Sequence, residues 1–375
     1  MSALLDEFGL GDARERDESW RYSKTALRAL AQQEFTAADA HASLDESLVA
    51  RFDWPRTRGR RLVFINGNYS DAHSDAGSIA AGVDVRHEDG QRWVLAVAGD
   101  CVEPLHVVYA TIPGPAATRW QAVAEIDLQA GRANIIEQHV GAAGADVLGA
   151  LHSHIAVAPG AGLHLTTLID LPDSASLYRR VNATVARGGA CHFSDAIFGG
   201  RLQRADVNVE LNGEGARFES RGVFVLRGRQ HADTHLDIRH AARETACDVL
   251  WRGVADQRAR GVFHGAITVA PGADGADARL SNKNLLLSAQ AEIDTQPVLE
   301  IYADEVKAAH GATVGQLDDT ALFYLRSRGV PAIMARSLLI AGFCREAFAG
   351  VADVDVRGRL DALLAERLPH SGVGE

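Results

Sequence analysis

The stretch LEIYADEVKAAHGATVGQLDDTALFYLRSR, residues 299–328, joins a β-rich chain to a helical tail. Its first letters, LEIYA, place every second side chain on one apolar face, and this period of two indicates a strand. His310 is the only titratable side chain in the segment AAHGATVG. Asp318 or Asp319 can cap a following helix, and Gly329 can end it. The sequence therefore predicts a change from strand to helix with one histidine at the junction.

Upstream of this junction, from about residue 131 to 315, short apolar segments recur between turns rich in Gly, Asp, Asn and Ala-Pro. Many short strands without long helices are compatible with a sandwich, a barrel or a β-solenoid. Two features favour the solenoid: the strands keep a uniform length, and AVAPGAG at 156–162 is nearly repeated as TVAPGADG at 268–275. We therefore expect a mainly β protein with its core at residues 131–315.

The flanking regions have a different character. Residues 1–60 are predicted to be helical, with one helix in ESWRYSKTALRALAQQEF and a short one in DESLVARFDWP. Residues 61–130 are predicted to be a mixed α/β region, in which TRWQAVAEIDLQAG is compatible with a helix or a strand. Residues 316–375 are predicted to form a helical domain of three helices.

Composition excludes several function classes. The chain has 375 residues, 47% hydrophobic and 23% charged, and a formal net charge of −11, which argues against nucleic acid or an anionic membrane as main partner. None of its three lysines, Lys24, Lys283 and Lys307, follows the glycine-rich loop of a Walker A ATPase. No membrane-spanning apolar run and no signal peptide are visible, so we expect a cytoplasmic protein.

The four cysteines Cys101, Cys191, Cys247 and Cys344 are dispersed, without a C-x-x-C pair. An iron–sulfur cluster held by one chain requires several thiolates close together. We therefore expect small buried or half-exposed thiols in a reducing compartment, and no cofactor held stably by this chain alone.

The opening stretch, with RARGVFHGAITVAPGA and LSNKNLLLSAQAEIDTQPVLEIYADEVK before it, is similar to the SufB/SufD family of the SUF machinery for iron–sulfur cluster assembly. Trp20, Arg21 and Tyr22 in WRYSKTALRAL carry a fainter similarity. The resemblance implies a right-handed parallel β-helix core between an N-terminal helical and mixed region and a C-terminal helical domain. It also implies a non-enzymatic scaffold that pairs with a SufB-like subunit and binds a SufC-like ABC ATPase.

His310 is the sharpest site candidate, because imidazole can ligate iron or accept a proton. A lone histidine in a tight corner is more often structural, but family members carry a histidine at this place. The resemblance implies a cluster-assembly interface with SufB at His310, Gly311 and Thr313, where iron or a cluster is held transiently. Family members often show Cys-Ser before this histidine, whereas Ala308 and Ala309 stand here. The departure removes a thiolate, so either that cysteine is dispensable or the chain depends on the SufB-like partner for all soft ligands.

Other polar groups are expected to be structural. His152 and His154 face one side of a strand and lack a third ligand nearby in sequence. We also assign structural roles to a histidine group at a loop or sheet edge, two stacked amides, and carboxylates on a solvated strand face. These residues are His231, His235 and His240; Asn282 and Asn284; and Glu292, Asp294 and Glu300.

The tail helices present an apolar surface that is broad for so short a domain. The resemblance implies that they dock the SufC-like ATPase; the plain structural interpretation, which is compatible with it, is that they cap the open end of the solenoid. The residues expected to bind this partner are Phe323, Tyr324, Ile333, Leu338 and Phe343.

Two other interpretations stay open, a β-helix enzyme and a SufB-type chain. A β-helix enzyme acting on carbohydrate or acyl groups would use His310 as general base and carboxylates such as Asp294. A hexapeptide acyltransferase would need six-residue repeats, which are absent. A SufB-type chain is disfavoured by the missing cysteines and the short length. The sequence indicates neither whether a flavin is used in the complex nor whether the chain forms a homodimer when alone.

Overall fold

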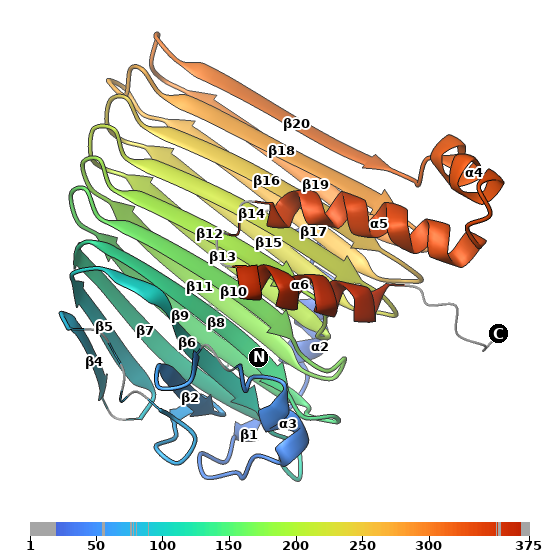
Figure 1. The fold of residues 1–375 in the computed structure, drawn as a ribbon, viewed down its shortest axis with the longest axis horizontal. Helices are drawn as coiled ribbons and strands as arrows, with labels where there is room; N and C mark the ends of the chain where they lie inside the picture. Colours follow the sequence, from blue (N-terminus) through green and yellow to red (C-terminus); the bar gives the residue numbers. More distant parts are fainter. Residues whose placement is uncertain are drawn as a thin grey trace.

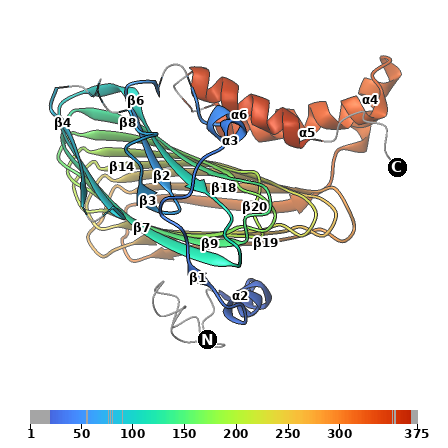
Figure 2. The ribbon, with the colours of Figure 1, turned by 90° about the horizontal axis from the view of Figure 1, so that it is seen from below.

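The protein is a parallel β-solenoid of about eight turns with helices packed on its outside, as seen in a computed structural model (Figure 1). The structure describes residues 20–368, except 55–56, 76, 78, 80, 89, 350 and 352–353. The predicted mainly β fold is confirmed, and the strands form two sheets that face each other (Figure 2).

Sheet A has the order β19-β17-β15-β13-β11-β9-β7-β5-β4, with the short β1 beside β7. Its strands are β1 (Thr36–Ala37), β4 (Val83–Glu88), β5 (Arg92–Ala98), β7 (Thr118–Ala130), β9 (Val147–Val157), β11 (Ser176–Val185), β13 (Leu202–Leu211), β15 (His231–His240), β17 (Arg260–Val269) and β19 (Glu292–Ile301). All pairings are parallel except that of β4 with β5.

Sheet B has the order β20-β18-β16-β14-β12-β10-β8-β6-β2-β3. Its strands are β2 (Arg61–Ile65), β3 (Asn68–Tyr69), β6 (Cys101–Thr111), β8 (Arg132–Gly141), β10 (Gly162–Asp170), β12 (Ala190–Ile197), β14 (Arg217–Leu226), β16 (Ala246–Ala255), β18 (Asp277–Leu286) and β20 (Lys307–Gly315). Only β2 and β3 pair antiparallel.

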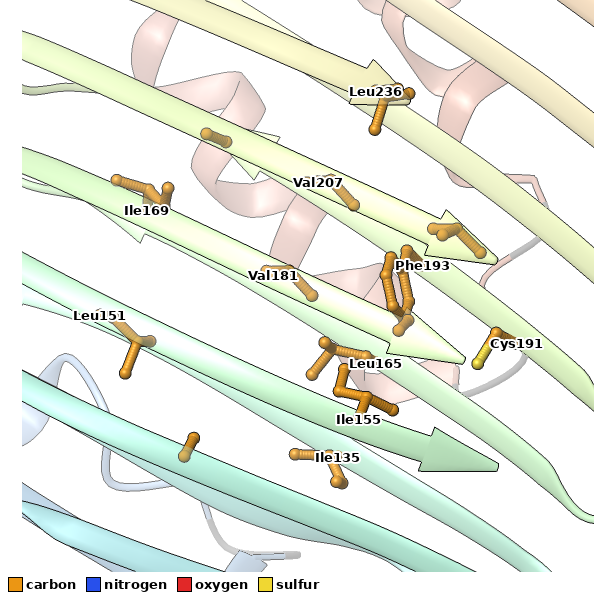
Figure 3. Close-up of a cluster of buried hydrophobic side chains, with 14 of the residues drawn as sticks. Ile135, Leu151, Ile155, Leu165, Ile169, Val181, Cys191, Phe193, Val207 and Leu236 are labelled. Atoms are coloured by element: carbon orange, nitrogen blue, oxygen red, sulfur yellow. The ribbon is translucent and has the colours of Figure 1, made fainter. Parts of the chain in front are cut away.

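Each turn of the solenoid adds one strand to each sheet, so equivalent side chains stack in rows across neighbouring strands. Ile135, Leu165 and Phe193 form such a row on sheet B. Figure 3 shows these side chains in the space between the sheets together with Val181 and Val207 of sheet A. Along each strand, the apolar residues therefore point into the interior between the sheets, and the polar residues between them point to the outer face.

The two similar turn sequences occupy equivalent places. AVAPGAG follows the end of β9 and TVAPGADG the end of β17, and each leads into the next strand of sheet B. Gly160 and Gly272 have φ values of 72° and 80°, a conformation that costs glycine little. The repeated turn sequence therefore reflects the repeating unit of the solenoid.

The parallel strands begin before residue 131, since β6 and β7 already pair in parallel with β8 and β9. TRWQAVAEIDLQAG is a strand, β7, and the described part of residues 61–130 contains strands β2–β7 without a helix. The expected mixed α/β character is therefore absent from that described part.

The two ends of the solenoid differ. At the first end, the antiparallel pairs β4/β5 and β2/β3 close the sheets, and Tyr69 stacks on His87 at 4.1 Å between ring centroids. The outermost strand β4 exposes Asp84, Arg86 and Glu88. At the other end β19 and β20 form the last turn, and no described element continues either sheet (Figure 1).

The described helices lie outside the solenoid. They are α2 (Lys24–Ala31), α3 (Glu46–Ala50), α4 (Asp319–Ser327), α5 (Ala332–Phe348) and α6 (Val354–Arg367). α2 packs on sheet A, and α3, α5 and α6 pack on sheet B (Figure 2). The three predicted tail helices are confirmed, but the expected capping of the open end is wrong, because α5 and α6 cover the outer face of sheet B. Their apolar residues, among them Ile340 and Leu360, cover outward side chains of the sheet B strands β8, β10, β12, β14 and β16.

Buried ion pairs hold these helices in place. Asp170, at the end of β10, pairs with Arg51 after α3 at 2.7 Å and also with Arg367 of α6. The buried guanidinium of Arg252 on β16 pairs with Glu346 of α5 at 2.8 Å. Since unpairing a buried charge is costly, these contacts fix where α5 and α6 lie on sheet B.

Candidate functional surfaces

His310 lies on β20, the edge strand of sheet B at the open end. In the register it stands opposite Leu280 of β18, whose side chain is buried between the sheets. His310 therefore belongs to an inward-facing row, yet it is exposed because no further turn covers it. A partner that continued the sheets would bury this imidazole.

Gly311 and Thr313, the other residues expected at this interface, share the edge strand with His310. Because side chains alternate along a strand, they belong to the outer face of sheet B, whereas His310 faces inward. The carbonyl of Thr313 accepts a hydrogen bond of 3.1 Å from the amide of Asn284. The three residues thus share an edge but not a face.

Asn282 and Asn284 are buried at inward positions of β18. Their amides hydrogen-bond each other at 2.6 Å along the strand, and Thr295 of sheet A donates to Asn282 at 2.7 Å. The predicted structural role agrees with these contacts, which cross between sheets and along a strand. They rigidify the layer directly beneath the last turn.

The open end is also apolar. Ile301 and Tyr302 at the end of sheet A, and Val314 on β20, are exposed by 42%, 59% and 42%. Inward-row residues on the other turns lie in the core. The last turn is therefore an uncovered cross-section of the solenoid core.

A second exposed apolar surface lies on α4 and the first half of α5. We call it the α4–α5 patch; it consists of Phe323, Tyr324, Ile333, Met334 and Leu338, all at least 44% exposed. Four of these are the residues expected to bind a partner, and Met334 is an exposed neighbour outside that set.

Phe343 is not part of the α4–α5 patch. It is partly buried against the core beneath α5, and the Arg252 guanidinium lies 5.8 Å from its ring centroid. The helix period places it on the side that packs against sheet B, so the structure argues against its expected contact with a partner.

A buried network of charges, missed in the sequence, crosses the interior. Arg179 of β11 contacts Glu137 at 3.0 Å and Asp195 at 3.2 Å, both on sheet B. Burial and the Arg179 charge oppose each other: the pKa of Glu137 is lowered by Arg179 and His139, whereas burial raises the pKa of Asp195. The arginine is the group that makes two carboxylates tolerable between the sheets.

The N-terminal motif WRYS is bound to sheet A by a second buried network. Trp20 lies over the Arg204 guanidinium, 4.3 Å from carbon to ring centroid. The Ser23 hydroxyl contacts His231 at 2.9 Å and also donates to Asp233. Asp233 in turn pairs with Arg204 at 2.7 Å. This contact set gives WRYS a structural role in anchoring the chain before α2.

His231, His235 and His240 were expected in a loop or at a sheet edge, and this is wrong. They lie on β15, which is inside sheet A, and all three are buried. Their spacing reflects strand geometry: His231 and His235 point outward, and His240 points inward. His152 and His154 lie on the outer face of sheet A, as expected.

All four cysteines are buried free thiols, as predicted. Burial raises the pKa of Cys191, Cys247 and Cys344 to about 12, so these thiols are poor nucleophiles. Cys101, Cys191, Cys247 and Ala308 fall in one inward row of sheet B. The sequence alone does not show this row, because it depends on how many residues separate one strand of sheet B from the next.

The carboxylates proposed for an enzyme do not face His310. Glu292 and Asp294 lie on the outer face of sheet A, where both pair with Arg260 at 3.0 and 2.9 Å. In the described part of the chain, no group of three His, Cys, Asp or Glu side chains is arranged to hold a metal ion. His310 is therefore not part of such a group.

Comparison with known proteins identifies the family to which this chain belongs. Residues 123–343 match the family model described as SUF system FeS cluster assembly, SufBD core domain. The chain belongs to the SufBD family. This SufBD protein is 28% identical to the iron-sulfur cluster assembly protein SufD of Escherichia coli over 94% of its own length and 89% of that protein.

Two further relatives agree. An iron-sulfur cluster assembly SufBD family protein of Synechocystis is 27% identical over 92% of this chain and 85% of the relative. Bacillus subtilis SufD is 36% identical over a shorter region, 37% of this chain. This SufBD protein is therefore SufD-like. A span through a membrane is not indicated, because none of its described helices is both long and apolar enough.

Acid is expected to destabilise this SufBD protein through three buried histidines. Burial lowers the pKa of His106 to about 3 and those of His231 and His240 to about 4. In the unfolded chain these histidines bind protons below about pH 6.5, whereas in the folded chain they stay neutral until the pH reaches their lowered pKa values. Their contribution to the free energy of unfolding is therefore constant above about pH 6.5 and falls below it. We expect a loss of about 2 kcal/mol per histidine at pH 4.5, read from urea unfolding at pH 7 and 4.5.

The variant His106→Gln tests this origin, since glutamine can still bond Thr57 and Gln138, the present partners of His106. The difference in the free energy of unfolding between pH 7 and pH 4.5 should shrink by about 2 kcal/mol, the contribution of one histidine. His154→Gln, on an exposed side chain, should leave it unchanged. Equal pH dependence in wild type and His106→Gln would contradict the assignment.

Proposed function

We propose that this SufBD protein is a SufD-type subunit of the SUF machinery: a non-enzymatic, cytosolic scaffold that pairs with a SufB-like subunit through its open end. The uncovered last turn carries the proposal. Its edge strand β20, with exposed Val314 and His310, offers unpaired backbone and apolar side chains to a second solenoid. A partner that continued both sheets would cover the end as an added turn does.

We assign the α4–α5 patch to a SufC-like ABC ATPase. Exposed aromatic and aliphatic side chains on a helix are typical anchors of protein interfaces. The patch is held in place from behind, because the buried face of α5 packs on sheet B. ATP-driven closure of such a partner could then pull on α5 and, through sheet B, on the open end.

In this proposal His310 supplies a ligand or a proton acceptor for iron or a cluster that is cargo shared with the SufB-like subunit. Its exposure at the inward row would place it between the two solenoids. The remaining ligands come from the partner, since Ala308 and Ala309 replace the thiolate-bearing pair often found before this histidine.

Co-expression with a SufB-type subunit and a SufC-type ATPase tests the proposal. Val314→Glu at the open end should lose the SufB-type subunit and keep the ATPase. His310→Ala should keep both partners and lose cluster assembly. Wild-type assembly by His310→Ala would refute the role of His310, and retention of the SufB-type subunit by Val314→Glu would refute pairing at this end.

A β-helix enzyme with His310 as general base is the alternative. It requires a carboxylate or a basic group directed at the same space, and Glu292 and Asp294 are instead bound to Arg260 on the opposite sheet. Turnover of carbohydrate or acyl esters by the isolated chain would favour this alternative over the scaffold.

A further inference from the structure

Three corners of the solenoid, the turns that join a strand of sheet B to the next strand of sheet A, form a groove beside the open end. They connect β14 to β15, β16 to β17 and β18 to β19. The groove has a volume of about 440 Å³, and its walls are residues 228–229, 257–258 and 288–290. Because residues 288–290 belong to the corner that leads into β19, the groove reaches the last turn of the solenoid.

The groove is positively charged, although the chain as a whole has a formal net charge of −11. Arg229 and Arg258 lie on its walls and are exposed, and none of its described lining residues is acidic. Among the residues that the structure describes, neither guanidinium has an ion-pair partner. Both charges are therefore available to a partner that brings carboxylates to this corner.

The side-chain amides of the groove add hydrogen-bond donors to these charges. The backbone N–H of Gly228 donates to Oε1 of Gln257 at 2.7 Å, and Nε–H of Arg258 donates to Oε1 of Gln290 at 2.8 Å. Because both amide oxygens already accept a hydrogen bond within the chain, each glutamine presents its NH₂ group to an incoming acceptor. Two guanidinium groups and two amide NH₂ groups fit the oxygens of a carboxylate.

Hydrogen bonds between the corners hold these donors in place. The backbone N–H of Arg258 donates to the carbonyl of Gly228 at 3.0 Å, and the Ser288 hydroxyl donates to the carbonyl of Gln257 at 2.7 Å. Gln257 adopts φ 59°, which is uncommon for a residue with a side chain. The groove is therefore formed before a partner arrives, which lowers the cost of ordering it on binding.

The other side of the last turns has the opposite charge. There the corners that join sheet A to sheet B line a cleft with four carboxylates and two basic side chains: Glu244, Asp277, Asp304 and Glu305, and Arg217 and Lys307. The open end therefore has a basic side and an acidic side. An acidic surface is attracted to the first and repelled by the second, so charge distinguishes the two ways round in which a partner can meet this end.

We propose that the groove receives carboxylate side chains of the SufB-like subunit and thereby fixes the orientation in which the two solenoids meet. The inference rests on the pairing at the open end that the proposed function contains. A solenoid that continues both sheets places one of its own corners next to residues 288–290, within reach of Arg258 and Arg229. Arginine binds a carboxylate through two parallel N–H bonds, so the contact selects geometry as well as charge.

Arg229→Glu combined with Arg258→Glu tests the inference in binding of the full-length chain to a purified SufB-type subunit. We expect the association rate to fall at least about tenfold at about 50 mM NaCl, because like charges replace the attractive ones. The loss should shrink to about twofold at about 500 mM NaCl, where salt screens exposed charges. Biolayer interferometry at both salt concentrations measures the rates, and circular dichroism checks folding.

Arg187→Glu combined with Arg239→Glu is the matched control. Both side chains are exposed and lie outside the groove, and the change in net charge is the same. The control should associate within about twofold of the wild-type rate. Equal rates for the groove variant and the control would overturn the inference and leave pairing intact, and so would a loss that salt does not reduce. A wild-type chain that binds no SufB-type subunit would overturn both the pairing and the inference.

Discussion

Replacing Arg179 with methionine is expected to lower the free energy of unfolding by about 3–5 kcal/mol. The guanidinium contacts Glu137 at 3.0 Å and Asp195 at 3.2 Å between the sheets. Without it, two carboxylates remain buried close together, and at neutral pH one or both must take up a proton or admit water. Urea unfolding followed by tryptophan fluorescence and circular dichroism measures the loss.

Arg180→Met is the matched control for this change. Arg180 is the next residue on β11, but it belongs to the outer face, where it lies 5.6 Å from the Tyr178 ring centroid. Its replacement should cost less than about 1 kcal/mol. The triple variant Arg179→Met, Glu137→Gln, Asp195→Asn should recover part of the lost stability, since it removes the stranded charges. Equal losses for Arg179→Met and Arg180→Met would contradict the role of the network.

The second large effect is expected at the α4–α5 patch. Phe323→Glu combined with Leu338→Glu should weaken binding of a SufC-type ATPase by at least about 100-fold, because charged side chains would replace two apolar anchors. Their present exposures are 71% and 50%, so the folded chain should tolerate both changes. Titration calorimetry with the purified ATPase measures the affinity.

Val354→Glu is the control for surface charge, since Val354 is 64% exposed and belongs to α6 outside the patch. It should leave ATPase affinity within about twofold of wild type. Deletion of residues 316–375 is a poor substitute, because it would also expose the sheet B residues that α5 and α6 cover. Unchanged affinity in the double glutamate variant would place the ATPase elsewhere.

The fold was predictable because its signals are local. The period of two in each strand and the two similar turns at 156–162 and 268–275 depend only on nearby residues. The position of α5 was not predictable. Its sequence shows apolar residues all round, and only the outer face of sheet B decides that Ile340 is buried while Leu338 stays exposed.

The candidate sites likewise divide into those marked by local sequence and those that depend on contacts in the folded chain. His310 could be found from its motif, and its place at the open end follows from the strand register. Arg179 and Asp195 resemble solvated strand residues in sequence, because nothing nearby marks their side chains as inward. The buried contact of His240 Nε2 with Cys247 Sγ at 3.2 Å was equally hidden, because it joins strands of opposite sheets.

The unequal ends of the solenoid set a limit on assembly size. A solenoid with exposed, unpaired sheet edges at both ends would add copies without limit and form a filament. Among the described residues, the first end is closed by antiparallel hairpins, and the edge strand β4 of sheet A carries Asp84, Arg86 and Glu88; the β19–β20 end is open to extension. Two solenoids joined at their open ends would present closed ends to solvent in both directions, and growth would stop at a pair.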